Sequence, residues 1–262
     1  MNRTRVLVVG CAGQMGGTLV RTLAGEDDLQ LVGAVDVVSV GDDAGVVAGG
    51  ARADIPVTDN VPAAVAATSP DVGVVFTSPS AGMATVRALL AHRVATVVGT
   101  TGFAESDFEE ITALCREHDS PALVASNFAI GAVLMMRFAA EAAPHFDQVE
   151  IIELHHERKA DAPSGTALRT ARAITEARAE GPPPAGPEGA PSRGLPHGRV
   201  HLHSVRLPGL VAHQEVLFGA TGQTLTIRHD SLSRESFMPG VLLAIRRIRG
   251  LTGLTREIDS LL

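Results

Sequence analysis

The fold is decided by the stretch Val6-Leu7-Val8-Val9-Gly10-Cys11-Ala12-Gly13-Gln14-Met15-Gly16, near the start of a chain of 262 residues. Residues 6–9 are apolar and mostly β-branched, which predicts a short buried strand. Residues 13–23 carry apolar side chains at helical spacing, which predicts a helix. Glycines between a strand and a helix permit a tight turn, and amide groups at the helix start can hold a pyrophosphate. The stretch therefore indicates either a dinucleotide-binding loop or a turn that only caps the helix.

Asp36 favours the first of these two interpretations. It follows a second predicted strand at 29–35 and lies 20 residues after Gly16, where an acid can accept the ribose hydroxyls of the adenosine. Ala12 departs from the usual pattern, which often has glycine at that position. A carboxylate repels a 2′-phosphate, and the next basic residue is Arg52. The loop and the acid together predict dinucleotide binding, with NADH favoured and NADPH possible.

Strand-like and helix-like stretches then alternate along the first half of the chain. Residues 37–53 predict a loop. Strands are predicted at 72–76, 95–98 and 122–125, and helices at 83–91, 105–117 and 130–143. Such alternation needs crossovers between parallel strands, so we expect a Rossmann-type, doubly wound parallel α/β sheet.

The pattern changes after about residue 144. The proline-rich residues 181–196 predict a surface loop. Strands are predicted at 148–155, 200–206, 215–219 and 223–228, and helices at 166–179 and 235–248. These strands lie close together in the sequence, which favours a C-terminal α+β domain with a mixed, mostly antiparallel sheet. We therefore expect two domains, with a boundary near residue 127.

Composition excludes several classes of protein. A net charge of −7 leaves no basic surface for a nucleic acid. The longest uncharged run, residues 120–136, is shorter than the ~20 apolar residues of a membrane span and contains Pro121. Two cysteines exclude a disulfide scaffold and a four-thiolate zinc site. Arg3, Arg5 and Cys11 resemble a lipoprotein signal, but the apolar run between them is too short. We expect a cytoplasmic protein without a membrane or nucleic-acid partner.

The most informative stretch for chemistry is Glu153-Leu154-His155-His156-Glu157-Arg158-Lys159-Ala160-Asp161-Ala162-Pro163-Ser164-Gly165-Thr166-Ala167. If the strand extends to His156, the adjacent histidines point to opposite faces, and no third His or Cys ligand lies near. No metal is therefore expected. Ser164, Gly165 and Thr166 precede a helix and can bind a carboxylate, while Lys159 and a histidine can supply charge and a proton to an imine. The alternative is a solvated charge run before an ordinary capped helix.

Two further loops, 99–103 and 125–128, follow predicted strands at the edge where such sheets bind ligands. On these residues alone, ordinary turns are an equal alternative to a nicotinamide site.

These motifs together resemble the dihydrodipicolinate reductases, also called 4-hydroxy-tetrahydrodipicolinate reductases, of the diaminopimelate route to lysine. The resemblance covers nearly the whole chain, and the segment 153–167 is its most specific part. It implies hydride transfer from NAD(P)H to a cyclic imine dicarboxylate, with loss of water. It also implies a homotetramer formed through the C-terminal sheet, no metal, and a last helix that rejoins the first domain. The expected domains are 1–126 with 237–262 for the dinucleotide, and 127–236 for substrate and oligomerisation.

The resemblance also assigns roles to individual residues. His155 is implied as the proton donor and acceptor and Lys159 as a proton donor, and His156 joins residues 164–166 in binding substrate. The implied cofactor residues are Gly10, Cys11, Ala12, Gly13, Gln14, Met15, Asp36, Gly99, Thr100, Thr101, Ala125, Ser126, Asn127 and Phe128.

Two other functions remain as alternatives. One is a different two-domain nicotinamide oxidoreductase acting on a small carboxylate, such as an aspartate-semialdehyde dehydrogenase. That chemistry needs a nucleophilic cysteine, and neither Cys11, in the glycine loop, nor Cys115, in a predicted helix, is well placed for it. The other is a non-catalytic NADH-binding regulator, which would leave the cationic cluster at 155–159 without a purpose.

Overall fold

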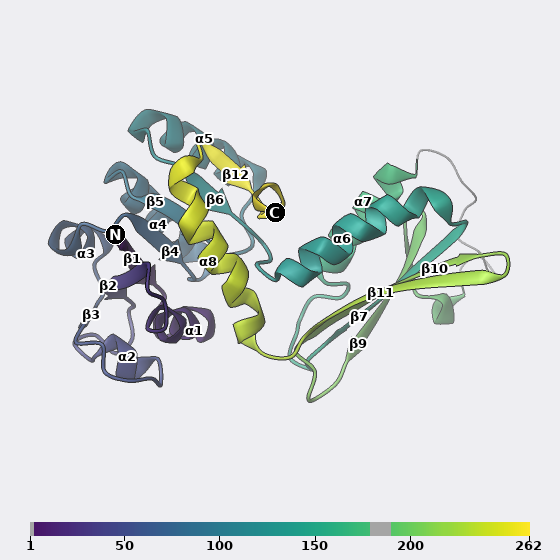
Figure 1. The fold of residues 1–262 in the computed structure, drawn as a ribbon, viewed down its shortest axis with the longest axis horizontal. Helices are drawn as coiled ribbons and strands as arrows, with labels where there is room; N and C mark the ends of the chain where they lie inside the picture. Colours follow the sequence, from purple (N-terminus) through teal and green to yellow (C-terminus); the bar gives the residue numbers. More distant parts are fainter. Residues whose placement is uncertain (1–2, 179–189) are drawn as a thin grey trace. The chain divides into compact units, whose positions relative to one another are not determined.

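The computed structural model describes residues 3–178 and 190–262, which form two compact units (Figure 1). Unit 1 consists of Met1–Phe128 and Phe237–Leu262, and unit 2 consists of Ala129–Ser236. Unit 1 is thus built from both ends of the sequence, whereas unit 2 is one continuous segment.

Unit 1 contains a seven-stranded parallel sheet with the strand order β12-β6-β5-β4-β1-β2-β3. The central strand β4 and its neighbour β5 are buried along their whole length, as expected when helices cover both faces. The strands are β1 (Thr4–Val9), β2 (Leu29–Val35), β3 (Val57–Thr58), β4 (Val72–Val75), β5 (Ala95–Val98), β6 (Ala122–Val124) and β12 (Leu254–Arg256).

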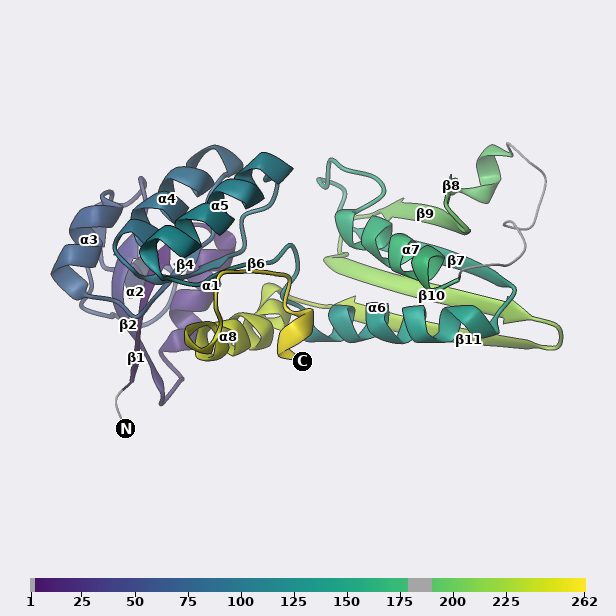
Figure 2. The same cartoon turned by 90° about the horizontal axis from the view of Figure 1, so that it is seen from above.

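The helices of unit 1 form two layers (Figure 2). Helices α3, α4 and α5 pack side by side on one face of the sheet, and α1 and α8 pack on the other. Their bounds are α1 (Gln14–Leu23), α2 (Ala44–Val47), α3 (Val61–Thr68), α4 (Pro79–Ala91), α5 (Glu105–His118) and α8 (Met238–Arg247), with the short 3-10 turns η4 (Ile248–Gly250) and η5 (Asp259–Leu261). The 3-10 turn η3 (Arg234–Phe237) lies where the chain passes from unit 2 back to unit 1. This arrangement confirms the predicted doubly wound sheet.

Unit 2 contains a five-stranded mixed sheet with the order β11-β10-β7-β9-β8. Among the strand pairs in the described part of unit 2, the β7–β9 pair alone is parallel, which confirms the predicted, mostly antiparallel sheet. Helices α6 (Ile130–Ala142) and α7 (Gly165–Ala177) cover one face of it. The strands are β7 (Gln148–His155), β8 (Leu195–His197), β9 (Val200–Arg206), β10 (Ala212–Ala220) and β11 (Gln223–Ser231), and the 3-10 turns are η1 (Ala143–His145) and η2 (Pro191–Arg193).

Several predicted elements were wrong or missing. The predicted loop at 37–53 contains α2, and the predicted loop at 181–196 contains η2 and most of β8 in the part that is described, while 181–189 lies outside the described residues. The helix predicted at 235–248 starts as the 3-10 turn η3. β3, α3 and β12 were not predicted, because β3 and β12 are only two and three residues long and α3 shows little amphipathic pattern.

Candidate active site

The glycine loop between β1 and α1 is shaped by two glycines that tolerate no side chain. Gly10 has a φ of +89°, and a Cβ there would lie 2.1 Å from the carbonyl oxygen of Phe76. A Cβ on Gly16 would lie 2.0 Å from the carbonyl oxygen of Gly10, so the first turn of α1 packs directly on the loop. Gly13 begins α1 without a side-chain cap, which leaves the first amide groups as donors. Loop and helix start therefore fit the pyrophosphate of a dinucleotide.

A cavity of about 590 Å³ lies beside this loop, with Asp36 in its lining. One carboxylate oxygen of Asp36 accepts the amide of Ala12 at 2.9 Å, and the other accepts the amide of Val38 at 3.1 Å. Each oxygen keeps a second lone pair, which is the acceptor that a ribose hydroxyl needs. Among the described residues, the lining contains two carboxylates, Asp36 and Asp59, and neither lysine nor arginine.

The loops after β5 and β6 lie along a smaller cavity of about 210 Å³. Glu257, just after β12, accepts hydrogen bonds from the amide of Ser126 at 3.1 Å and from its hydroxyl at 2.8 Å. The buried Thr100 hydroxyl accepts the amide of Thr77 at 3.1 Å and lies 3.2 Å from its carbonyl oxygen. Both loops are therefore held by residues distant in sequence.

The predicted cofactor residues fall into three groups. Four of them line the large cavity, namely Gly10, Ala12, Gly13 and Asp36, and three line the small one, namely Thr100, Thr101 and Ser126. The others line neither of these two cavities as far as the structure describes them: Cys11, Gln14, Met15, Gly99, Ala125, Asn127 and Phe128. The Phe128 ring is buried and packs edge-on against the ring of Phe76, with 6.2 Å between their centroids, so it supports these loops from the core of unit 1.

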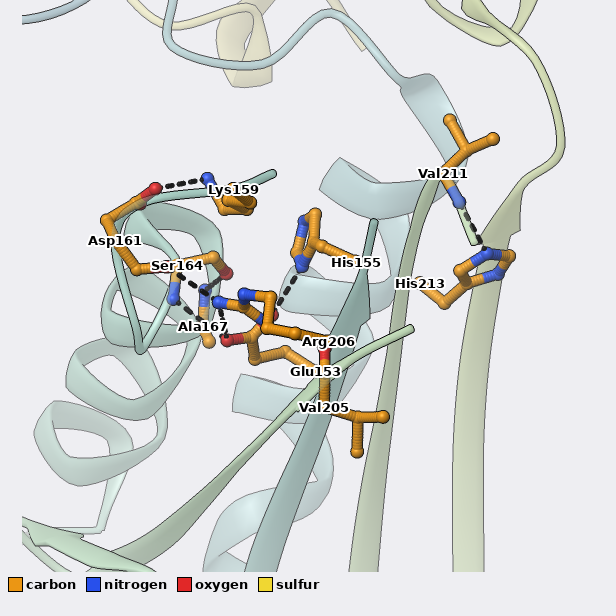
Figure 3. Close-up of polar contacts among 10 residues, drawn as sticks. All are labelled: Glu153, His155, Lys159, Asp161, Ser164, Ala167, Val205, Arg206, Val211 and His213. Atoms are coloured by element: carbon orange, nitrogen blue, oxygen red, sulfur yellow. Dashed lines mark hydrogen bonds and ion pairs between the residues drawn. The ribbon is translucent and has the colours of Figure 1, made fainter. Parts of the chain in front are cut away.

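In unit 2, the candidate site begins at the carboxyl end of β7 (Figure 3). Side chains alternate along this strand, so Glu153 and His155 share one face. Glu153 is completely buried, whereas the His155 side chain is 13% exposed. Nδ1 of His155 is hydrogen-bonded to Oε2 of Glu153. Because β7 ends at His155, the predicted alternation of the two histidines does not extend to His156.

Glu153 accepts hydrogen bonds from three parts of unit 2. Arg206 on β9 donates to Oε1 at 2.7 Å and to Oε2 at 3.0 Å, and the amide of Ser164 donates to Oε1 at 3.2 Å. Burial by itself would raise the pKa of the Glu153 carboxyl, but hydrogen bonds from His155, Arg206 and Ser204 outweigh burial and lower its pKa to about 2. The carboxylate is therefore ionised at neutral pH.

Lys159 lies in the loop between β7 and α7. Its ammonium group donates to Asp161 at 2.7 Å, and its amide donates to the carbonyl oxygen of His156 at 3.2 Å. Burial would raise the pKa of Asp161, but the bond from Lys159 outweighs it and lowers that pKa. Asp161 is more than half exposed, so the ion pair is weak enough for Lys159 to exchange it for a ligand. Nδ1 of His156 is buried and has no hydrogen-bond partner among the described residues, which leaves it for a ligand.

The start of α7 offers donors to an anion. Ser164 caps the helix by accepting the amide of Ala167 at 3.2 Å, and its hydroxyl can still donate a proton. Gly165 is exposed, and a Cβ built there would meet nothing within 4 Å. The surface beside the start of α7 is therefore open at Gly165, where a carboxylate can approach.

The two cysteines do not suit nucleophilic catalysis. Both are free and buried. Burial raises the pKa of the Cys11 thiol to about 11 and also raises that of Cys115. A reactive cysteine needs a lowered pKa and exposure, which argues against the aspartate-semialdehyde dehydrogenase alternative.

Three residues of the site had no predicted role: Glu153, Arg206 and Glu257. Glu153 could have been found, because it continues the core-facing positions of Val149 and Ile151 along β7. A charged residue at such a position signals a buried pair. Arg206 and Glu257 carry no local signal, since their partners lie 53 and 131 residues away.

Known proteins resemble this chain in sequence and in fold. A family model described as "Dihydrodipicolinate reductase, N-terminus" matches residues 4–128, and "Dihydrodipicolinate reductase, C-terminus" matches residues 131–262. The 4-hydroxy-tetrahydrodipicolinate reductase of Desulfitobacterium hafniense is 47% identical and covers 100% of both chains, and that of Moorella thermoacetica is 45% identical over 98% of this chain and 97% of its own. A solved structure, the dipicolinate-bound dihydrodipicolinate reductase from Paenisporosarcina sp. TG-14, has a TM-score of 0.85 and 39% identity, covering 99% of this chain and 100% of that one.

Proposed function

This chain belongs to the dihydrodipicolinate reductase family, and from that membership we propose how its two units share one reaction. The chain is an oxidoreductase that reduces 4-hydroxy-tetrahydrodipicolinate to tetrahydrodipicolinate with a nicotinamide cofactor, and water is lost. The reaction belongs to the diaminopimelate route to lysine. The observation that carries this conclusion is 47% identity to a curated reductase over the full length of both chains.

Unit 1 is the proposed dinucleotide-binding domain. The amide groups at the start of α1 suit the pyrophosphate, Asp36 suits the adenosine ribose, and the loops of Thr101 and Ser126 suit the nicotinamide end. The cofactor, when bound, supplies the hydride. We favour NADH over NADPH, because the described lining of the large cavity presents the carboxylates of Asp36 and Asp59 and no cation to a 2′-phosphate.

Unit 2 is the proposed substrate-binding domain. A substrate with two carboxylates needs two anion sites, and Lys159 together with the helix start at Ser164, Gly165 and Thr166 supplies donors for them. The solved relative's name records bound dipicolinate, itself a dicarboxylate, which supports this assignment. His156 contributes the buried nitrogen that lacks a partner within the described part of the chain.

We assign proton transfer to His155 and Lys159. Hydride addition to a conjugated imine builds negative charge on the ring, which then takes up a proton. Nε2 of His155 is the ring nitrogen that Glu153 leaves free, and Lys159 can give a proton from its ammonium group. Cationic groups at this place also stabilise the developing charge.

We further propose a cytoplasmic homotetramer assembled through the sheet of unit 2. The described helices α6 and α7 cover one face of this sheet and leave the opposite face of β7 and β10 without a helix. Both cysteines are free, as is usual in a reducing compartment. In the described residues, no helix is long and apolar enough to cross a bilayer. Light scattering on the purified protein measures the oligomeric state directly.

A coupled assay tests the function. The substrate is generated in place from pyruvate and aspartate semialdehyde by the partner synthase, and the loss of reduced-cofactor absorbance is followed with NADH and with NADPH. Oxidation that requires every component supports the reductase. Bound NADH without any turnover would instead favour the non-catalytic regulator.

A further inference from the structure

We propose that Glu153 is a positioning residue for this reaction: it selects which nitrogen of His155 exchanges a proton and ties that ring to the start of α7. The proposal rests on the proposed role of His155. It adds a function for a carboxylate that has no exposed surface and that contacts His155 and the amide of Ser164 from inside unit 2.

The placement of Glu153 in the strand demands an explanation. It occupies a core-facing position of β7, in line with the buried Val149 and Ile151, and has no exposed surface. A buried carboxylate is costly unless it is paired and hydrogen-bonded. Arg206 forms a bidentate ion pair with this carboxylate and so neutralises its charge. That ion pair alone would explain a contribution to stability but no role in the reaction.

The hydrogen bond between Glu153 and His155 also determines which nitrogen of the His155 ring carries a proton. An ionised carboxylate can only accept, so Nδ1 of His155 must carry the proton that it shares with Oε2. In the neutral ring the lone pair is therefore on Nε2, and in the charged ring Nε2 carries the exchangeable proton. The proton chemistry of His155 is thus directed through one defined nitrogen.

The same network reaches the other groups of the site (Figure 3). Oε1 of Glu153 accepts the amide of Ser164, the residue that caps α7. Arg206 also donates to the carbonyl oxygen of Asp161 at 2.6 Å, and the Asp161 side chain holds Lys159. Glu153 and Arg206 therefore link His155, Lys159 and the anion-binding helix start in one hydrogen-bonded network, which is buried at Glu153 and exposed at Asp161.

Glu153→Gln tests the proposal, because glutamine keeps the shape and replaces an acceptor by an amide that can donate to Nδ1. The His155 ring would then carry its proton on Nε2. We expect kcat to fall about 100-fold or more, the usual contribution of a positioned acid or base. The affinity for NADH and for dipicolinate, used as a non-reacting probe and measured by calorimetry, should stay within about threefold.

A matched control lies three residues earlier on the same strand. Glu150 also accepts a histidine and an arginine, namely His203 at 2.8 Å and Arg193, but it lies outside the site. Glu150→Gln removes a carboxylate that has the same kinds of partner, although it is 32% exposed, and should leave kcat unchanged. A loss of kcat in both variants would overturn the specific role of Glu153.

The tautomer is measured independently of turnover. Long-range 1H–15N spectra of protein labelled at histidine report which nitrogen is protonated, and the signals of ring 155 are identified by their absence in His155→Gln. We expect a protonated Nδ1 in the wild type at pH 8 and a reversal in Glu153→Gln. Because this readout needs no substrate, it remains decisive even if the wild type fails to reduce the expected substrate, a result that would refute the proposed function alone.

The stability of the variant can be controlled. Glu153→Gln leaves Arg206 as a buried charge, so the double variant Glu153→Gln/Arg206→Met restores neutrality if the single variant does not fold. A folded variant with a reversed tautomer and low kcat supports the proposal. The proposal is overturned if Glu153→Gln keeps the tautomer of the wild type. It is also overturned if the kcat of this variant is unchanged, whether or not its KM for substrate is raised.

Discussion

Replacing Asp36 with alanine should abolish the preference for NADH over NADPH that we propose for unit 1. Both oxygens of this carboxylate already accept backbone amides, from Ala12 and Val38, which hold it at the wall of the large cavity. Each oxygen keeps one lone pair for a ribose hydroxyl. The variant removes both of these acceptors and the charge that repels a 2′-phosphate.

The size of the effect follows from those contacts. A hydrogen bond to a charged group contributes about 1.5–3 kcal/mol. Loss of one such contact to the ribose should therefore weaken NADH binding about 10- to 100-fold, since 1.4 kcal/mol is a factor of ten. NADPH makes no such contact through its 2′-phosphate, and the amides of Ala12 and Val38 become free to donate to that phosphate. The NADH-to-NADPH ratio of kcat/KM should fall by about 100-fold.

The assay is the coupled reaction run with each cofactor at constant ionic strength, supported by direct binding. Binding is followed by exciting the nicotinamide itself, since the chain contains no Trp or Tyr. Asp59→Ala is the matched control: this carboxylate lines the same cavity, and its removal should change the ratio by about threefold or less. An unchanged ratio in Asp36→Ala, or an equal change in Asp59→Ala, would refute the reasoning.

Three further predictions concern the active site and the thiols. His155→Ala and Lys159→Ala should each lower kcat about 100-fold or more while the Kd of NADH, from cofactor fluorescence, is unchanged; loss of NADH binding in both would contradict the division between the units. The folded pKa of Glu153, about 2, lies below its ordinary 4.5, so its contribution of about 3 kcal/mol is present above pH 4.5 and is lost as the pH falls towards 2. In urea unfolding, the difference in free energy of unfolding between the wild type and Glu153→Gln should accordingly become smaller from pH 7 to pH 3. A difference that stays constant would show that the lowered pKa of Glu153 is not its source. Cys11 and Cys115 should react with Ellman's reagent at pH 8 only after denaturation, because burial raises both pKa values; fast labelling of the native protein would contradict their burial.

The sequence predicted most accurately those strands whose apolar or alternating pattern begins and ends within a few consecutive residues. The strands Leu29–Val35, Ala95–Val98 and Gln148–His155 have their predicted bounds, because continuous apolar or alternating runs end there at charged or turn residues. β12 could not be predicted, since three residues carry no period and its pairing with β6 depends on the folded sheet.

The same distinction holds for the site. The segment from Glu153 to Ala167 indicated an anion and proton-transfer site from its residue types alone. The role of Glu153 depended on Arg206, which the parallel pairing of β7 and β9 brings beside His155. Side-chain networks across strands therefore required the structure, whereas the chemistry of this segment was predicted from residues that are neighbours in the sequence.

The return of the chain to unit 1 has a consequence for the order of folding during synthesis. Residues 129–236 form one continuous unit, which can fold as soon as it has been translated. At that point β6 is still the unpaired edge strand of the sheet of unit 1, because its partner β12 is synthesised more than a hundred residues later. Ser126 gains its carboxylate partner only when Glu257 has left the ribosome. The smaller cavity of unit 1 should therefore be the last part of this unit to form during synthesis. It is complete only in a chain that has been translated beyond β12.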